Sequence, residues 1–97
     1  MSDKKIIKYQ LEDISDRTGY YSCTRVDVPK GGKVIDISYE GDVIYLHIIV
    51  NPNHRNKERW FSIFEENMPM EEYEKKTFEY IGRVGVSPEL YVFEVHD

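Results

Sequence analysis

The fold is decided by residues 26–52, VDVPKGGKVIDISYEGDVIYLHIIVNP. Two runs of alternating apolar and polar residues, 33–39 and 43–50, are separated by the tripeptide EGD at 40–42. Alternation with a period of two is typical of β-strands. Glycine can adopt the positive φ that a tight turn requires, so this stretch predicts a β-hairpin.

The two strands of this hairpin differ in character. The second, VIYLHIIV at 43–50, is the most apolar run of the chain, which predicts a central strand covered on both faces. In the first, alternation places Ile35, Ile37 and Tyr39 on one face.

The glycine pair before the hairpin, in PKGGK at 29–33, raises the question of a phosphate-binding loop. Such a loop requires GxxxxGK followed by serine or threonine, and it leads into a helix. Here Val34 follows the lysine and the next element is a strand, which offers no helix dipole. We therefore interpret PKGGK as a structural hairpin turn in which the glycines supply unusual φ values.

The rest of the chain continues the β pattern. Alternating or apolar runs occur at 5–11, 20–28, 59–64, 78–86 and 90–96, and the last two predict a closing hairpin. The segment 67–76, NMPMEEYEKK, is the one helical candidate, since proline suits a first turn. The sequence thus predicts one domain, residues 1–97, that is mainly β. We expect a small β-sandwich or partly open barrel of six or seven strands, with at most one short helix near 69–76.

Composition limits the partners and the cellular compartment that we expect for this protein. The net charge is −5, and an acidic domain is poorly suited to gripping duplex nucleic acid. The single cysteine, Cys23, excludes an internal disulfide and fits a reducing compartment. No apolar stretch approaches the roughly 18 residues of a membrane span, and the first residues lack the features of a signal peptide. We expect a soluble protein of the cell interior with no membrane partner.

Five motifs occur in a fixed order along the chain. They are KYQL at 8–11, VPKGGKVIDI at 28–37, IYLHIIVNP at 44–52, YIGRV at 80–84 and YVFEVHD at 91–97. In this order they resemble a family of short, uncharacterised phage and prophage proteins, over nearly the whole chain. The family often has a tryptophan where this chain has His47, and a glycine-threonine-glycine-histidine turn where it has EENMPM. The resemblance implies a phage origin and a small β-rich fold, and it implies no activity.

Catalytic and metal-binding patterns are weak, so an enzyme is not expected. No spacing pairs Cys23 with a base, and the acid pairs at 65–66 and 71–72 fit solvated surface charges. His47 lies in mid-strand without His-x-His or Cys-His spacing, which is more typical of a hydrogen-bonded residue than of a metal ligand. We predict no cofactor and no metal.

The segment NPNHRNKERW at 51–60 is the most suggestive of a binding site. It is predicted to be a loop through residue 59, and its basic residues are followed by the only tryptophan of the chain. Guanidinium and aromatic groups are what a site uses to hold a phosphate and stack a base. The alternative is a solubilising loop whose tryptophan begins the next core strand. The predicted ligand-binding residues are His54, Arg55, Arg59 and Trp60, with Tyr45 and His47 lining the pocket from a neighbouring strand face.

These observations lead to alternative functions for a non-enzymatic phage protein of the host cytoplasm. It could sequester a phosphate-bearing nucleotide signal as a counter-defence protein. It could instead inhibit a host defence protein by binding it, or be a minor virion or assembly component. A small β domain has open strand edges, so we also expect a homo-oligomer, with residues 90–96 as the contributing strand.

Overall fold

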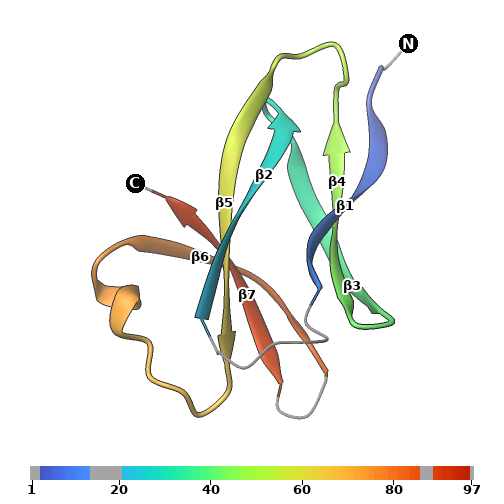
Figure 1. Cartoon of the computed structure of the whole chain (residues 1–97). Helices are drawn as coiled ribbons and strands as arrows, with labels where there is room; N and C mark the ends of the chain where they lie inside the picture. Colours follow the sequence, from blue (N-terminus) through green and yellow to red (C-terminus); the bar gives the residue numbers. More distant parts are fainter. Residues whose placement is uncertain (1–2, 14–20, 86–88, 97) are drawn as a thin grey trace.

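The computed structural model describes residues 3–13, 21–85 and 89–96, and two antiparallel sheets make up most of it (Figure 1). The strands are β1 (Lys5–Asp13), β2 (Tyr21–Pro29), β3 (Lys33–Glu40), β4 (Val43–Val50), β5 (Asn56–Glu65), β6 (Thr77–Val84) and β7 (Leu90–His96). A single 3-10 turn, η1 (Glu71–Glu74), precedes β6. One sheet has the order β1-β4-β3 and the other β2-β5-β7-β6. The predicted mainly β class and strand number are confirmed, and the two sheets form an open sandwich; the helical candidate at 67–76 forms only this 3-10 turn.

One cluster of apolar side chains fills the space between the sheets. It takes alternate residues from both inner faces: Leu11, Val26, Val28, Ile44, Leu46, Ile48, Val50, Phe61, Ile63, Val84, Leu90 and Val92. Strand β4 is central in its sheet, as predicted, and Leu46 and Ile48 are fully buried. Its other face, with Tyr45 and His47, is only half-buried. Coverage of β4 on both faces was therefore a wrong prediction, because the second sheet packs against one side only.

The PKGGK turn connects two strands that lie in different sheets, so the predicted hairpin between them is wrong. Strand β2 pairs with β5 and β3 pairs with β4. Gly31 does adopt the expected positive φ, 84°, and Gly32 donates its N–H to the carbonyl of Pro29 at 3.1 Å. Gly32 lies where the chain passes over the end of the core. A Cβ added to it would lie 2.9 Å from Val28 Cγ1 and 3.0 Å from Ile48 Cγ2. The second glycine is thus required for space.

A β-bulge changes the faces of β3. The register with β4 shifts between Val34 and Asp36, so Ile35 is an extra residue. Val34 and Ile37 pack against the core, while Ile35 is 43% exposed. The prediction that Ile35 and Ile37 share one face is wrong, because an inserted residue reverses the alternation on either side of it.

The outer face of the four-stranded sheet carries a second, aromatic cluster. Phe64, Phe78 and Phe93 contact one another edge to face at 5.5–6.2 Å, and Tyr73 of η1 stacks on Phe78 at 5.5 Å. The closing hairpin β6–β7 is confirmed. Strand β7 lies between β5 and β6, and both of its edges are paired. It has no free edge to offer another copy of the chain, which contradicts the role predicted for residues 90–96.

Gly32→Ala tests the crowding at the sheet-to-sheet crossing. The added Cβ would meet side chains of the core, so we expect a loss of about 1–3 kcal/mol in the free energy of unfolding. Gly85→Ala is the matched control, because no atom lies within 4 Å of its Cβ position and its φ is not positive. That change should stay within about 0.5 kcal/mol of wild type in urea denaturation. Equal stability of the two variants would show that the crossing is not tightly packed.

Candidate ligand-binding site

The basic segment 51–60 is a short loop followed by a strand. Strand β5 begins at Asn56, three residues earlier than the sequence predicts. β5 begins this early because β2 pairs with it as far as the last residue of β2. Val28 lies opposite Lys57 and Pro29 opposite Asn56. This pairing brings the PKGGK turn beside the basic segment, two features that are separate in the sequence.

Hydrogen bonds join the two connections at this end of the molecule. The N–H of Lys30 donates to the carbonyl of Arg55 at 2.8 Å. His54 Nδ1 lies 3.0 Å from the carbonyl of Lys30 and acts as the donor, since a carbonyl only accepts. Within the loop, the N–H of Asn53 donates to Asn51 Oδ1 at 3.0 Å. The ring of His54 therefore holds the backbone in place, while the side chain of Arg55 is exposed.

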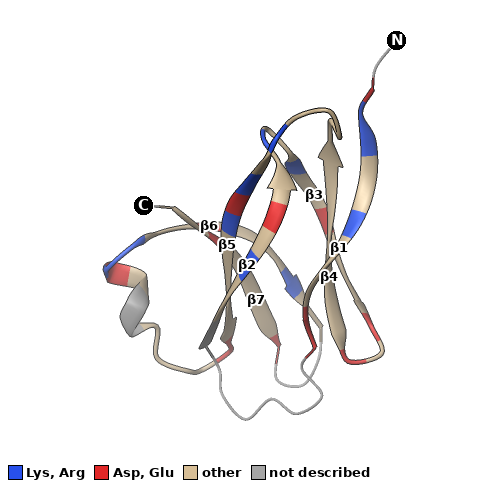
Figure 2. Ribbon diagram, turned by 45° about the horizontal axis from the view of Figure 1, so that its top comes forward, with Lys and Arg blue, Asp and Glu red and all other residues tan. Residues whose placement is uncertain are grey.

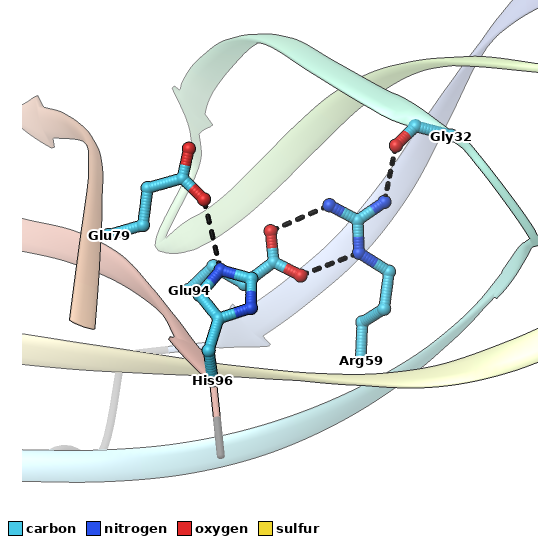
Figure 3. Close-up of polar contacts among 5 residues, drawn as sticks. All are labelled: Gly32, Arg59, Glu79, Glu94 and His96. Atoms are coloured by element: carbon cyan, nitrogen blue, oxygen red, sulfur yellow. Dashed lines mark hydrogen bonds and ion pairs between the residues drawn. The ribbon is translucent and has the colours of Figure 1, made fainter. Parts of the chain in front are cut away.

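Arg59 is a link between structural elements. It lies on the core-facing side of β5 with Phe61, and its Nε and Nη2 donate to the two carboxylate oxygens of Glu94 at 2.7 and 2.6 Å (Figure 3). Its Nη1 donates to the carbonyl of Gly32 at 2.5 Å. The two side chains are only 17% and 7% exposed. One guanidinium thus ties the PKGGK turn to β5 and β7.

Glu79 and His96 extend this network (Figure 3). Glu79 of β6 lies directly opposite Glu94 of β7, and His96 Nε2 donates to Glu79 Oε1 at 3.0 Å. Ligand atoms of Glu79, Glu94 and His96 lie within 4.8 Å of one another, which is close enough to surround a metal ion. Both oxygens of Glu94, however, already accept hydrogen bonds from Arg59. We interpret the group as a hydrogen-bonded network in which Arg59 pairs with Glu94 and His96 donates to Glu79.

A cleft of about 630 Å³ opens beside this network. The β2–β3 turn forms one wall and the strands β5 and β7 form the other: Lys30, Gly31, Gly32, Lys57, Glu58, Arg59, Trp60, Glu94, Val95 and His96. No described side chain forms an ion pair with Lys30 or Lys57. Trp60 is 43% exposed. The cleft therefore combines two available ammonium groups with Trp60, whose side chain extends from the face of β5 opposite to that of Lys57 and Arg59.

Basic side chains predominate at one end of the strands, although Asp3, Asp27 and Glu58 also lie there (Figure 2). Lys5 pairs with Val50 and Lys33 with Ile49, so both lie at the end that carries Lys30, Arg55 and Lys57. The opposite end carries the acids Glu12, Asp13, Glu40 and Glu65, together with Arg83. A protein with net charge −5 thus presents one basic end. The lysines that form it are scattered along the sequence and meet only through strand pairing.

Tyr45 and His47 lie elsewhere, on the outer face of the three-stranded sheet. His47 Nε2 is 2.8 Å from Ser38 Oγ, and Lys8 Nζ is 4.4 Å above the ring of Tyr45. A hydrogen bond from Lys8 to Glu40 raises the pKa of the lysine and lowers the pKa of the carboxyl. The structure therefore brings Arg59 and Trp60 together at the cleft, with His54 and Arg55 beside the adjoining turn. It leaves Tyr45 and His47 on the opposite sheet.

Sequence reasoning missed most of the residues that line the cleft, among them Lys30, Lys57 and Glu94. Lys30 was assigned to a purely structural turn, Lys57 was not placed in the site, and Glu94 was not considered. Only the register of β2 with β5 and of β5 with β7 brings them together. Comparisons with protein-family models, curated proteins and solved structures gave no match. Within the described part of the chain, no helix has the length and apolar character needed to cross a membrane.

Arg59→Met tests the link between the turn and the sheet. We expect it to lower the free energy of unfolding by about 3 kcal/mol, because Glu94 would remain buried without its partner. The double change Arg59→Met/Glu94→Leu should be more stable than Arg59→Met alone, since no uncompensated charge remains. Urea denaturation measures both.

Arg83→Met is the matched control for this experiment. Arg83 pairs with Glu89 at 3.3 Å in an exposed setting, with side chains 60% and 32% exposed. Its loss should lower the free energy of unfolding far less than the loss of Arg59, because an exposed ion pair contributes little. If Arg59→Met and Arg83→Met had the same effect, the Arg59–Glu94 pair would not be a structural link.

Proposed function

We propose that the protein is a non-enzymatic binding protein that captures a small, phosphate-bearing nucleotide in the cleft between the β2–β3 turn and β5. The observation that supports this is the presence of Lys30 and Lys57, without acidic partners among the described residues, in a cleft whose lining also includes the half-exposed Trp60. Ammonium groups bind phosphate as point charges, and an aromatic face stacks a base. A volume of about 630 Å³ lies within the range of small-molecule sites.

The arrangement of nucleophiles favours binding over catalysis. Ser38 and His47 lie within hydrogen-bond distance, but they stand on the outer face of a sheet. The hydroxyl of Ser38 also donates to Glu40 Oε2 at 3.3 Å, so it is not paired with the imidazole alone. Cys23 is exposed, and no described histidine contact involves it.

The resemblance to phage and prophage proteins supports a setting in the cytoplasm of an infected bacterium. Capture of a signalling nucleotide there would deprive a host defence system of its signal. The small size of the cleft and the acidic character of the rest of the molecule agree with a small ligand and not with a nucleic acid duplex.

Direct binding of a host protein is a second candidate function. Tyr80 and Tyr73 are 53% and 46% exposed over the aromatic cluster on the outer face of the four-stranded sheet. Exposed tyrosines are enriched where proteins bind one another. The two functions use different surfaces, so they can be separated by experiment.

Recovery of the natural ligand is the first test. The protein is purified from bacterial cells, denatured by heat, and the released small molecules are identified by mass spectrometry. We expect a co-purified nucleotide. A host protein retained in a pulldown, with no released nucleotide, would support the second function instead.

Loss of the two lysines tests the cleft itself. Trp60 is the only tryptophan of the chain and lines the cleft, so its fluorescence reports binding directly. We expect Lys30→Ala/Lys57→Ala to weaken binding of the recovered nucleotide about ten- to a hundredfold or more, because charge-assisted hydrogen bonds are lost. The melting temperature should not change, since neither side chain makes an ion pair within the described residues.

Lys5→Ala/Lys33→Ala is the control for long-range charge. It removes the same charge from the same end of the molecule, outside this cleft. Its affinity should stay within a few-fold of wild type. Equal losses in the two double variants would mean that the basic end attracts the ligand without forming a site.

A further inference from the structure

The outer edge of β2 is a long, regular strand edge. Strand β2 is the first strand of its sheet and pairs with β5 from Tyr21–Phe64 to Pro29–Asn56 without a register shift. No strand in the described part of the chain pairs with its other edge. The nearest strand of the other sheet, β1, contributes a 3.3 Å hydrogen bond from Thr24 Oγ1 to Glu12.

The other three edge strands are each interrupted by a bulge. The register shifts between Gln10 and Glu12 in β1, between Val34 and Asp36 in β3, and between Tyr80 and Gly82 in β6. A bulge twists an edge and interferes with the addition of another strand. Strand β2 has no bulge along the pairs that the structure describes. The N–H and C=O groups on its outer edge can therefore pair with a strand of another chain.

The sequence of this edge is complementary to itself. We infer that two copies of the chain pair β2 with β2, antiparallel, across a two-fold axis that passes through Val26. In this register Arg25 of each copy lies directly opposite Asp27 of the other, which gives two ion pairs. The two four-stranded sheets become one continuous sheet of eight strands.

Local charge favours a second copy as the occupant. Asp27 lies opposite Glu58 of β5, and like charges directly opposite are unfavourable. Arg25 is shared between them, with its Nη1 3.4 Å from Glu58 and its Nε 3.7 Å from Asp27. All three side chains are exposed, and in the dimer Asp27 gains a second guanidinium from the partner. Arg25 and Asp27 do not line the cleft, so this inference is independent of the proposed function.

Sedimentation velocity over a range of micromolar concentrations tests the dimer. We expect the wild-type chain to reach twice its mass of 11.5 kDa. Arg25→Asp and Asp27→Arg each place like charges opposite one another twice, so each should raise the dissociation constant at least about tenfold. The double variant Arg25→Asp/Asp27→Arg exchanges the two charges and should return to within a few-fold of wild type.

Melting temperatures show that the variants fold. Asp27→Arg removes the like-charge pair with Glu58, so its fold should be at least as stable as wild type while its dimer is weakened. A wild-type chain that stays monomeric throughout this range would overturn the inference. Single variants that dimerise as well as wild type would also overturn it. A double variant that dimerises no better than the single variants would do the same, because the register through Val26 restores both ion pairs when the two charges are exchanged.

Discussion

The ion pair between Arg59 and Glu94 determines how one end of the sandwich is built. Burying two charges costs several kcal/mol in desolvation, which only good geometry offsets. Here the carboxylate accepts two parallel bonds from the guanidinium, and the remaining nitrogen donates to the carbonyl of Gly32. The two charges thus neutralise each other, and the guanidinium also holds the carbonyl of Gly32 in the turn. An apolar pair at the same place would fill the space but would not hold the turn.

The position of this pair follows from the way the chain changes sheets. Two of the crossings, after β2 and after β4, occur at the same end of the molecule (Figure 1). Each crossing leaves the core and exposes backbone groups that need partners. Gly32 meets this need through Arg59, and Lys30 through Arg55 and His54. The cleft is the space that these bonds keep open between the turn and the strands.

Alternation along the chain was sufficient to predict the strands, the hairpin at 40–42 and the closing hairpin. These features depend on local sequence, because side-chain period and turn glycines act over a few residues. What alternation does not contain is which strands pair. The pairing of β2 with β5 places Lys57 opposite Val28, and the bulge at Ile35 reverses a face. Arg59 shows the same limit: the pattern RWFSIF leaves either Arg59 or Trp60 on the inner face, and only the core position of Phe61 decides between them.

The engagement of Arg59 by Glu94 also shapes what the cleft can bind. Because these two charges neutralise each other, the guanidinium does not add to the attraction for a ligand. Glu58 is likewise held by Arg25 at 3.4 Å. The charge available to a ligand is therefore that of Lys30 and Lys57, within a molecule of net charge −5. A nucleic acid duplex carries about one charge per 1.7 Å and would meet the acidic remainder of the surface. Two lysines in a cleft whose lining includes Trp60 instead suit a compact anion, because the acids at the far end of the sandwich lie beyond a Debye length and are largely screened from it.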